Sequence, residues 1–598
     1  MDDASPTLLD RPTRIGLILL ALAQGCALYL LHLTIDAGVW PATDMRWLKA
    51  LYTVFIALPA VFYLGVERLA ERRNGLVAVV LGVLLFFLGW HLGWVESVAG
   101  VEPSARHTFA PAFVLSLGVT LFILIFFFRA WSAAGSLRFD YERLLTFSWQ
   151  QALTLGMLGL FVGVFWLLLW LWADLFSVIG IDAFKELFSK PIFIYPVTWL
   201  IGGFGLVLIR ERIRLIATVQ LMCEVLTKAL LPLAAVIVVL FLGALPLTGL
   251  QPIWNTGRAA LLMLLLTVVL LFFFNAVLSG DPERPPYPVI VRRLVFLTIM
   301  LLPASVLLAA WALWLRIEQY GLTLDRLWAA VMLLLIAAYA FSYAVLLLWQ
   351  RDRALWSIQT VNRRLALVVV AVLLAVNTPV ADPRAWAAND QVVRLLRGKV
   401  DSEDFDYVYL RFSLGAYGDR ALRRIAQSDL AQDNPAVAKR VADVLKMENR
   451  RGEPVVDKTD MVAVASAFMV EPAGAAIPEL LLRKVVDSES HCLRRSNSCR
   501  AVRLPASDGG ADWMFMNGGR SAYVYGKAYA LREGTWLHMG DVGSAGCDDS
   551  ARGEVGRVAM RRVPGPFLVY SDGRCFYSVT PKRAYLLQLT GADGGVAE

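Results

Sequence analysis

Long runs of apolar residues, uninterrupted by charge, dominate the first two-thirds of the chain. Eleven stretches without Asp, Glu, Lys or Arg each hold at least 17 residues and are rich in Leu, Val, Ile, Phe and Ala. A helix needs about 20 apolar residues to cross a hydrocarbon core of about 30 Å. The pattern therefore predicts eleven transmembrane helices, near residues 15–35, 50–66, 74–95, 107–128, 144–173, 191–209, 229–250, 259–280, 294–315, 327–350 and 365–381.

The pattern changes after residue 381, where no apolar stretch is long enough to cross a membrane. Asp382-Pro383 and Asn434-Pro435 each place a capping residue before Pro at a first helical position, which predicts helices in this part of the chain. From about residue 510 apolar and polar residues alternate, and Asp572-Gly573 separates two β-rich runs. These signals predict a helical neck followed by a small antiparallel sheet.

Composition agrees with a membrane protein. Of the 598 residues, 58% are hydrophobic and only 18% charged, and the mean hydropathy is +0.59, which excludes a disordered, collagen-like or coiled-coil chain. The net charge of +8 does not indicate a nucleic-acid partner, because most of the excess lies beside the apolar runs. The predicted fold is an all-α polytopic membrane bundle with a C-terminal extracytoplasmic α+β domain, divided into residues 1–381, a neck over 382–460 and a β-rich domain over 461–598.

Basic residues between the predicted spans give the orientation. The N-terminus and the even-numbered loops hold 19 Lys and Arg residues, whereas the odd-numbered loops hold 8. Because cytoplasmic loops carry the excess of basic residues, the N-terminus is expected in the cytoplasm. An odd number of spans then places residues 382–598 outside. No cleavable signal peptide is expected, since the first apolar run is too long for one.

Four of the six cysteines fall in the predicted outer domain: Cys492, Cys499, Cys547 and Cys575. An even number of cysteines in an oxidising compartment favours disulfides. Of the three pairings that four cysteines allow, Cys492–Cys499 with Cys547–Cys575 is favoured, because the first two are close in sequence. A zinc site completed by His491 is the alternative, although the usual CxxC pair is missing.

Two segments carry a family resemblance: FSWQQALTLGMLGLFVGVFWLLLWLWADLFSVIGIDAFKELF at residues 147–188, and NDQVVRLLRGKVDSEDFDYVYLRFSLGAYGDRAL at residues 389–422. Together with the many spans, they resemble the bacterial membrane proteins grouped as domain-of-unknown-function family 4153 (DUF4153). The resemblance covers the spans and the neck, less clearly the C-terminal sheet domain, and implies a polytopic protein of the bacterial envelope. With the orientation given by the basic residues, we expect a protein of the inner membrane whose C-terminal domain lies in the periplasm. The resemblance supplies no established activity and no catalytic residues.

An internal repeat is also predicted. Shifting residues 170–212 by 141 positions pairs Trp170 with Trp311 and Gly180 with Gly321. The paired spans would run in the same direction, which is a parallel repeat about an axis along the membrane normal. The alternative is that aromatic belts and cytoplasmic arginines recur in any such protein.

Ionisable or strongly polar residues within or beside membrane spans are candidate binding residues. We select Asp36, Asp174 and Asn275 as candidates for substrate or ion binding. The alternative for the two aspartates is a solvated helix end. For Asn275, as for Gln24 and Gln151, it is a hydrogen bond between helices.

Nucleotide and hydrolase signatures are missing: GxxxxGK[ST], GxGxxG, HExxH and GxSxG do not occur. We therefore expect no cofactor, no metal and no ATP-driven transport by this chain alone, and an enzyme is the less favoured class. The expected partners are the lipid bilayer, anionic lipid at the cytoplasmic arginines, and an envelope protein or small ligand at the periplasmic domain.

Three hypotheses of function remain open. The first is an envelope scaffold or a ligand- or partner-binding protein, and the second is a secondary transporter or lipid-handling protein. The third is a membrane enzyme similar to glycosyltransferases, whose first outer loop would have to supply acidic residues. A polar cavity at mid-depth favours transport, a sealed bundle favours a scaffold, and an outer acidic pocket that reaches Asp36 or Asp174 favours catalysis.

Overall fold

The computed structural model describes most of the membrane bundle and neck and the strands of the C-terminal sheet. The described residues are 9–69, 71–98, 101, 110–136, 139–249, 259–278, 287–350, 353–447, 450, 461–466, 468–472, 474–488, 499–504, 511–517, 525–532, 534–547, 561–563, 568–571 and 575–581.

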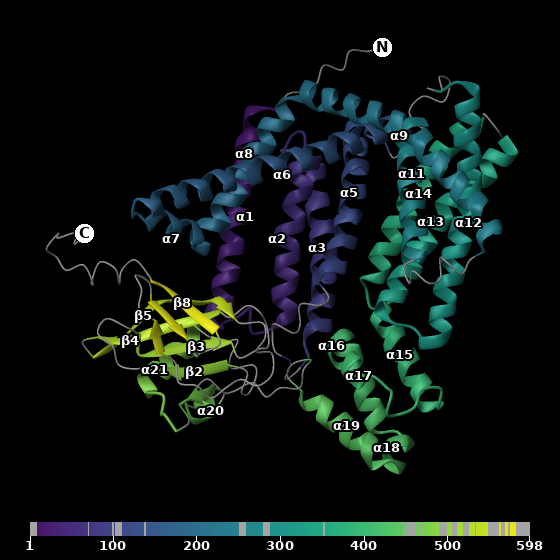
Figure 1. Ribbon diagram of the computed structural model, residues 1–598. Helices are drawn as coiled ribbons and strands as arrows, with labels where there is room; N and C mark the ends of the chain where they lie inside the picture. The colour runs from purple at the N-terminus through teal and green to yellow at the C-terminus, as the bar shows by residue number, and fades with distance from the viewer. Residues whose placement is uncertain are drawn as a thin grey trace. The chain divides into compact units, whose positions relative to one another are not determined.

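The chain divides into two compact units. The first holds residues 1–99 and 103–445, and the second holds residues 446–598 with the short segment 100–102. The first unit is helical and the second contains the sheet (Figure 1).

Within the described residues, eleven long helices form the bulk of the first unit. They are α1 (Arg11–Ala37), α2 (Met45–Gly65), α3 (Arg72–Glu96), α5 (Ala110–Ala134), α6 (Tyr141–Val178), α8 (Pro191–Glu211), α9 (Ile213–Thr248), α11 (Ala259–Leu278), α12 (Val289–Tyr320), α13 (Leu324–Gln350) and α14 (Ala354–Val376). Each predicted span overlaps one of them. In the described part of the chain, ten are long and apolar enough to cross a membrane. The apolar stretch of α11, Leu261–Val277, is shorter, so a count of eleven spans stays a prediction.

Several helix ends differ from the predicted boundaries, because a charged residue does not by itself end a helix. The last long helix, α14, begins at Ala354 and passes through Arg363 and Arg364, although its apolar run begins only after them. Likewise α9 begins at Ile213, well before its apolar run. Long basic side chains can extend toward water while their stems cover apolar surface, so the backbone stays helical.

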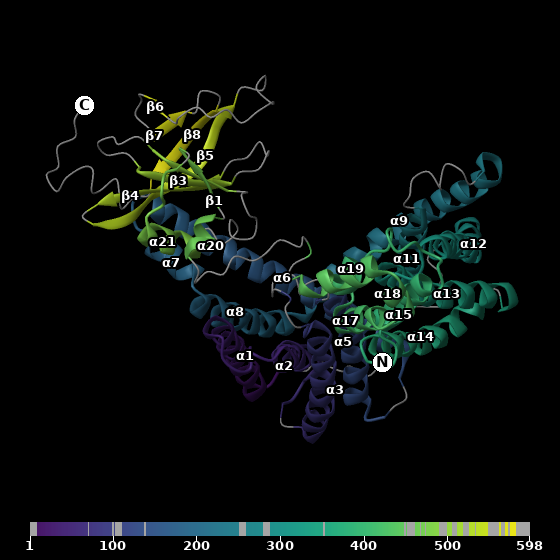
Figure 2. The same ribbon diagram turned by 90° about the horizontal axis from the view of Figure 1, so that it is seen from below.

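The long helices pack around two separate apolar cores. One core joins α1, α2, α3, α5 and α8, and the other joins α9 and α11 to α14. In both views the two sets stand side by side, and α6 runs along the first set, past α8, to α7 (Figures 1 and 2). The sets meet where α14 packs on α5, and α6 contacts α5, α8 and α9.

α6 is unusual in length and in exposure. It has 38 residues, of which only four are buried among the described residues: Leu144, Gln151, Thr154 and Ala173. The short α7 (Ala183–Ser189) follows it and turns Phe184 onto Trp172, with ring centroids 5.1 Å apart. The sequence predicts a short amphipathic segment here, and α7 is that segment; its place at the membrane surface stays an expectation.

The predicted repeat has local support in the backbone. Gly180 and Gly321, which the 141-residue shift pairs, both adopt a positive φ, of 99° and 78°. Helices α9 and α14 begin at Ile213 and Ala354, which are related by the same shift. Whether the helices of the two segments superpose stays a prediction.

Five helices follow the last long helix within the described residues of the neck: α15 (Pro383–Leu396), α16 (Tyr407–Ser413), α17 (Gly415–Ala426), α18 (Asp429–Asp433) and α19 (Pro435–Lys446). Both predicted helix starts are observed. The Asp382 carboxylate accepts from the backbone N–H of Arg384, and Asn434 accepts from Ala436. Residues 382–445 of the predicted neck lie within the first unit and pack as part of the bundle, whereas residues 446–460 belong to the second unit.

The second unit is built on one eight-stranded sheet with two described helices. The strands are β1 (Phe468–Glu471), β2 (Cys499–Arg503), β3 (Trp513–Asn517), β4 (Tyr525–Arg532), β5 (Thr535–Cys547), β6 (Arg561–Val563), β7 (Leu568–Ser571) and β8 (Cys575–Pro581). The helices are α20 (Met461–Ser466) and α21 (Glu479–Ser488). The strand order is β1-β2-β3-β4-β5-β8-β7-β6. A C-terminal sheet is as predicted, and β7 and β8 pair antiparallel around the predicted turn.

One edge of the sheet differs from the prediction of an antiparallel sheet. β1 and β2 are parallel, and α21 lies between them in sequence. A parallel pair needs such a crossover, which alternation of polar and apolar residues does not reveal. Leu481 and Val485 of α21 pack with Phe515 and Tyr529 on one face of the sheet.

Candidate functional site

A pair of glycines in α3 sets the geometry of the end of the bundle where the neck begins. Gly89 and Gly93 are four residues apart, so they lie on one face of the helix and allow α2 to approach closely. A Cβ on Gly89 would lie 2.7 Å from the carbonyl oxygen of Lys49, and one on Gly93 would overlap the carbonyl oxygen of Met45. The GxxxG spacing therefore fixes α3 against α2 at this end.

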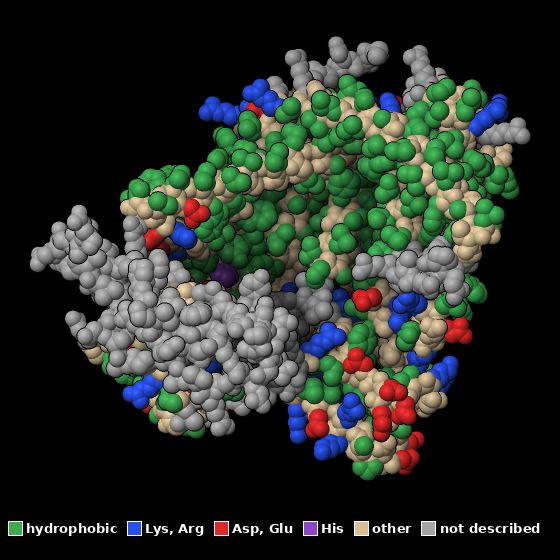
Figure 3. All heavy atoms as spheres, in the orientation of Figure 1, with side chains coloured by type: hydrophobic (Ala, Val, Ile, Leu, Met, Phe, Trp, Pro, Cys, Tyr) green, Lys and Arg blue, Asp and Glu red, His purple; other side chains and the backbone are tan. Residues whose placement is uncertain are grey.

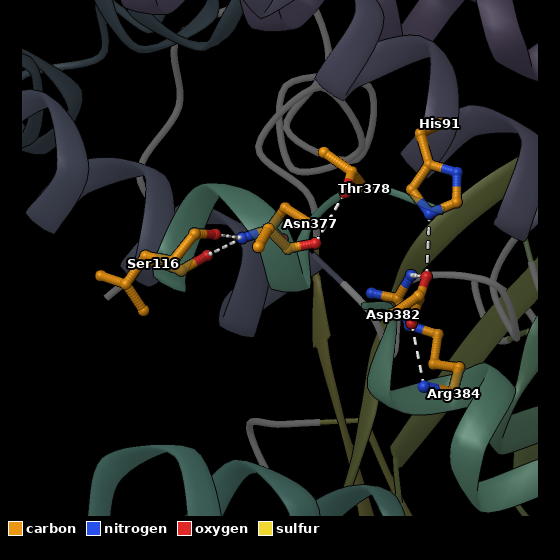
Figure 4. Close-up of polar contacts among 8 residues, drawn as sticks. His91, Ser116, Asn377, Thr378, Asp382 and Arg384 are labelled. Carbon is orange, nitrogen blue, oxygen red and sulfur yellow. Dashed lines mark hydrogen bonds and ion pairs between the residues drawn. The ribbon is translucent and has the colours of Figure 1, made fainter. Parts of the chain in front are cut away.

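His91 lies between these glycines and meets the neck (Figure 4). Its Nε2 is 2.9 Å from Oδ2 of Asp382, and Nη1 of Arg384 lies 3.4 Å from the same oxygen. The other carboxylate oxygen, Oδ1, accepts the backbone N–H of Arg384 at 2.9 Å and so caps α15. All three side chains are at most 8% exposed. The Asp382 carboxylate thus both caps the first neck helix and bonds His91 of α3.

A second buried ion pair lies at the same end of α3. Nζ of Lys49 is 2.7 Å from Oε2 of Glu96, and the glutamate side chain is fully buried. A buried carboxylate is costly unless a counter-charge accompanies it, and the close approach of α2 supplies that lysine. The contact adds an ionic link to the packing of α2 on α3.

Helix α17 docks on the same end of α3. Gly415, with φ of 57°, begins the helix, and a Cβ there would overlap the carbonyl oxygen of Val95. Tyr417 packs edge-on against Trp94, with ring centroids 4.9 Å apart, and the Arg420 guanidinium lies 4.6 Å above the same indole. Burial raises the pKa of Tyr417 to about 12. Such close backbone contact requires glycine at position 415.

Three further contacts hold the neck, and the turn that leads into it, to other helices. Asn377, which caps α14, donates to Oγ of Ser116 on α5 at 2.8 Å (Figure 4). Asp390 of α15 accepts the backbone N–H of Leu322 at 2.8 Å, in the turn between α12 and α13. The hydroxyl of Tyr409 on α16 accepts the backbone N–H of Leu324 at 2.8 Å, at the start of α13.

The neck therefore contacts α3, α12 and α13 through specific polar groups, and the turn that leads into it is tied to α5. We call this set of contacts the neck junction, defined by His91, Asp382, Arg384, Asp390 and Tyr409. His91, Asp382 and Arg384 are buried and paired with one another, whereas Asp390 is half-buried and bonds a backbone N–H. General acid–base catalysis needs a group within reach of a substrate proton, whereas these groups are bonded to one another. Their arrangement therefore fixes the position of the neck. The neck junction is suited to holding the neck in one orientation.

The three residues selected from the sequence lie apart. Asp36 faces His32 one turn earlier, with Nε2 and Oδ2 3.4 Å apart, and its side chain is 59% exposed. Asp174 is 65% exposed and lies 3.5 Å from Nζ of Lys185. Both arrangements match the alternative of a solvated helix end. Substrate or ion binding at these residues stays a prediction.

Asn275, the third candidate, belongs to a hydrogen-bonded cluster inside the second core. Its Oδ1 lies 2.9 Å from the hydroxyl of Tyr343 and accepts from Nδ2 of Asn362 at 2.6 Å. Tyr343 also bonds Oδ1 of Asn362, whose Nδ2 reaches the hydroxyl of Tyr141 at 3.0 Å. The cluster joins α6, α11, α13 and α14. Asn275 thus makes the interhelical bonds that the sequence offers as its alternative role.

Gln24 and Gln151 make bonds of the same kind. The Tyr63 hydroxyl donates to Oε1 of Gln24 at 2.6 Å, and Nε2 of Gln151 donates to the Phe122 carbonyl at 3.1 Å. The isolated polar residues of the spans therefore join neighbouring helices.

The cysteines are only partly described. Cys26 and Cys223 are free thiols. Cys547 and Cys575 occupy opposite positions on the paired strands β5 and β8. Cys492 lies outside the described residues, as does His491 of the alternative zinc site. Within the described parts of the chain, no three His, Cys, Asp or Glu residues gather closely enough to hold a metal ion.

Sequence reasoning missed the neck junction. In the sequence, His91 is one of five scattered histidines and Asp382 is recognisable only as a helix cap. Nothing local links the two residues, because 291 positions separate them. The signal that was available is Gly89 and Gly93 flanking His91, which marks a close helix contact beside an ionisable group within a span.

Comparison with known proteins places most of the chain in one family. The family model described as "Domain of unknown function (DUF4153)" matches residues 22–425, which covers the bundle and most of the neck. Residues 426–598, including the sheet, lie beyond the matched segment.

A short stretch of the chain is also similar to part of an oxidoreductase. One component of the NADH-quinone oxidoreductase of Ruthia magnifica subsp. Calyptogena magnifica is 31% identical over 103 residues. The aligned part covers 17% of this chain, and the chain spans about a quarter (26%) of that relative's length. No solved structure matches the chain.

Proposed function

The chain belongs to the DUF4153 family of membrane proteins, and from this premise we propose that it is an envelope scaffold of the bacterial inner membrane. In this role it anchors an extracytoplasmic ligand- or partner-binding domain to the membrane. The N-terminus lies in the cytoplasm, and residues after 381 lie in the periplasm. The multi-pass bundle serves as the anchor.

The neck junction is the observation that carries this proposal. A flexible tether would need no buried charges, yet Asp382 is 1% exposed and bonds both His91 and the start of α15. Breaking a buried ion pair is strongly destabilising, so a neck held this way keeps one orientation on the bundle. Rigid attachment of the segment that leads to a folded domain is what a scaffold requires.

The other two hypotheses have weaker support. Catalysis required an outer acidic pocket that reaches Asp36 or Asp174, and each of these carboxylates is exposed and faces a basic neighbour. Transport required a polar cavity near mid-depth. The described polar cluster around Asn275 lies nearer one end of the bundle instead, since its member Asn362 is only eight residues from the start of α14.

Disulfides in the sheet domain accord with a periplasmic location. Residues directly opposite on antiparallel strands have Cβ atoms about 4.5–5.5 Å apart, which a small backbone shift brings to disulfide distance. Cys547 and Cys575 occupy such positions. We propose that they form one disulfide and that Cys492 and Cys499 form the other.

Topology is the first test. Reporter fusions after Arg73, Arg143 and Arg353 should report the cytoplasm, and a fusion after Glu598 should report the periplasm. Thiol labelling of denatured, unreduced protein should modify Cys26 and Cys223 only. A cytoplasmic C-terminus with six reactive thiols would overturn both the orientation and the disulfides.

The scaffold itself is tested by crosslinking in cells. A photoreactive residue at Tyr525 or Leu531, both exposed on β4, should capture a discrete envelope component in the otherwise intact chain. Asp382→Ala should abolish that adduct without removing the protein from the membrane, and the exposed-site variant Asp174→Asn should retain it. An adduct that persists unchanged in Asp382→Ala would contradict the proposal.

A further inference from the structure

A pocket of about 190 Å³ lies beside the Asn275 cluster, between the two sets of helices. We call it the α6–α14 pocket. Residues from α5, α6, α11, α13 and α14 line it, and its walls differ in chemistry. One wall is apolar, formed by Phe126, Phe127, Leu144 and Ala366 among others. Amphipathic walls of this kind suit a ligand with an apolar and a polar part.

The other wall carries the hydrogen-bonding groups. Asn275, Asn362 and Tyr141 all reach the pocket, and the bonds among them and to Tyr343 hold their orientations. Ser148 of α6 lines the pocket too, two turns after Tyr141 on the same face of the helix. These side chains are fixed before any ligand arrives, which lowers the cost of binding.

Arg363 gives the pocket its charge. Of the described lining residues it is the only Lys, Arg, Asp or Glu. Its Nη1 donates to the carbonyl of Phe139 at 2.5 Å, which holds the guanidinium in place. A guanidinium has five N–H donors, and in the described part of the chain this is the bond that Arg363 makes. The remaining donors can serve an anionic ligand.

Size and depth restrict the ligand further. At about 190 Å³ the pocket is below the roughly 300–1,000 Å³ of a site for a drug-sized ligand, so it suits a small polar head group. Asn362 lies eight residues into α14, about 12 Å from its first residue. Beyond Arg363 on the same helix, Leu367 and Val368 are each 45% exposed. Apolar surface therefore leads away from the pocket along the bundle.

The arginine-rich end of the bundle and its apolar flank can be seen in the space-filling view. Figure 3 shows hydrophobic side chains covering the long helices, with Lys and Arg at the end opposite the neck. A ligand bound at Arg363 would thus have a head group near the charged end and a tail along apolar surface.

We propose that the α6–α14 pocket binds the anionic head group of a membrane amphiphile, with Arg363 as its charge partner and the Asn275–Asn362–Tyr141 wall as its polar contact. The tail stays outside the pocket, along the exposed face of α14. A soluble phosphate or carboxylate would share the head-group chemistry but would make no use of the apolar surface. This inference does not depend on the scaffold role.

Native mass spectrometry of the full chain tests the proposal. The protein is released from nanodiscs of phosphatidylcholine that contain phosphatidylglycerol, and retained lipid is counted. The intact chain should retain phosphatidylglycerol in preference to phosphatidylcholine. Arg363→Gln should weaken that retention roughly ten- to a hundredfold, the usual worth of a charge-assisted hydrogen bond. Arg364→Gln, which removes the same charge from an exposed neighbour, should retain it.

Ala366→Leu provides an independent variant, because it fills the pocket without altering charge or the bond to Phe139. It should also lose phosphatidylglycerol, and its size-exclusion profile reports whether the fold is intact. Equal losses in Arg363→Gln and Arg364→Gln would overturn the proposal, as would equal retention of both lipids. Binding of glycerol phosphate that displaces no lipid would also overturn it and would assign the pocket to a soluble anion.

Discussion

The neck junction and the α6–α14 pocket lie near opposite ends of α14. They differ in how they accommodate polar side chains between the helices. Asn362 and Asn377 are about 22 Å apart along α14. At the neck end, charged groups are buried and bonded to one another, as between Asp382 and His91. At the other end, neutral amides and phenols bond one another, and the single charge of the described lining borders a pocket.

This difference shows that charged and neutral polar groups suit different roles inside a membrane protein. Closed charge pairs are expensive to open, so they suit fixed contacts. Neutral clusters cost little to desolvate and can border a cavity, so they suit a binding surface. Substitutions at the two ends should therefore differ in size and in kind.

Asp382→Ala should have the largest effect. It leaves His91 and Arg384 without their carboxylate and removes the cap of α15, so we expect a loss of about 3–5 kcal/mol in the free energy of unfolding. Denaturant titration in mixed micelles measures it, and amide exchange should rise in α15 and α17 first. A loss under about 1 kcal/mol would show that the junction carries little of the stability of the neck.

Gly93→Ala tests whether α3 must approach α2 for the junction to form. The added methyl group would overlap the backbone of Met45, and overpacking of this kind costs about 1–3 kcal/mol. Gly118→Ala on α5 is the matched control, because nothing lies within 4 Å of its added Cβ. The control should be neutral or stabilising, and equal losses in the two variants would remove the special role of the GxxxG pair.

Tyr343→Phe should have a smaller effect, since it removes one neutral hydroxyl from the cluster at the pocket end. Hydrogen bonds between membrane helices average about 0.6 kcal/mol, and we expect a loss of about 0.5–1.5 kcal/mol in unfolding free energy. The same titration measures it, with Tyr339→Phe as the control. A loss as large as that of Asp382→Ala would erase the distinction between the two ends.

Asp174→Asn should have the smallest effect. The carboxylate and its partner Lys185 are both more than half exposed, and such pairs contribute at most about 1 kcal/mol. Unfolding free energy should change by less than about 0.5 kcal/mol. A larger change would indicate that Asp174 has a role that its exposed ion pair does not explain, as the sequence hypothesis of ligand binding would require.

Elements governed by local sequence were predictable, and contacts between distant segments were not. Each long apolar run meets a helix, and the caps at Asp382 and Asn434 begin helices because the signal lies within four residues. Helix length was underestimated where arginines continue a helix, as at Arg363. The parallel β1–β2 pair was missed because a crossover, and not residue alternation, determines it.

The candidate site shows the same division. Asn275 was selected as an isolated polar residue in an apolar run, and it does lie in the cluster at the pocket. Its partner Asn362 was not selected, because two arginines follow it and hide the span in which it lies. Arg363 counted only toward orientation, since a sequence does not reveal which arginine faces a cavity.

The length of α6 has a consequence for the membrane itself. Its 38 residues extend about 57 Å, nearly twice the hydrocarbon thickness, so a helix immersed along its length must incline steeply. An inclined helix converts a change in bilayer thickness into a change of angle. Because only four of its residues are buried, most of the surface of α6 is available to lipid along this inclined path.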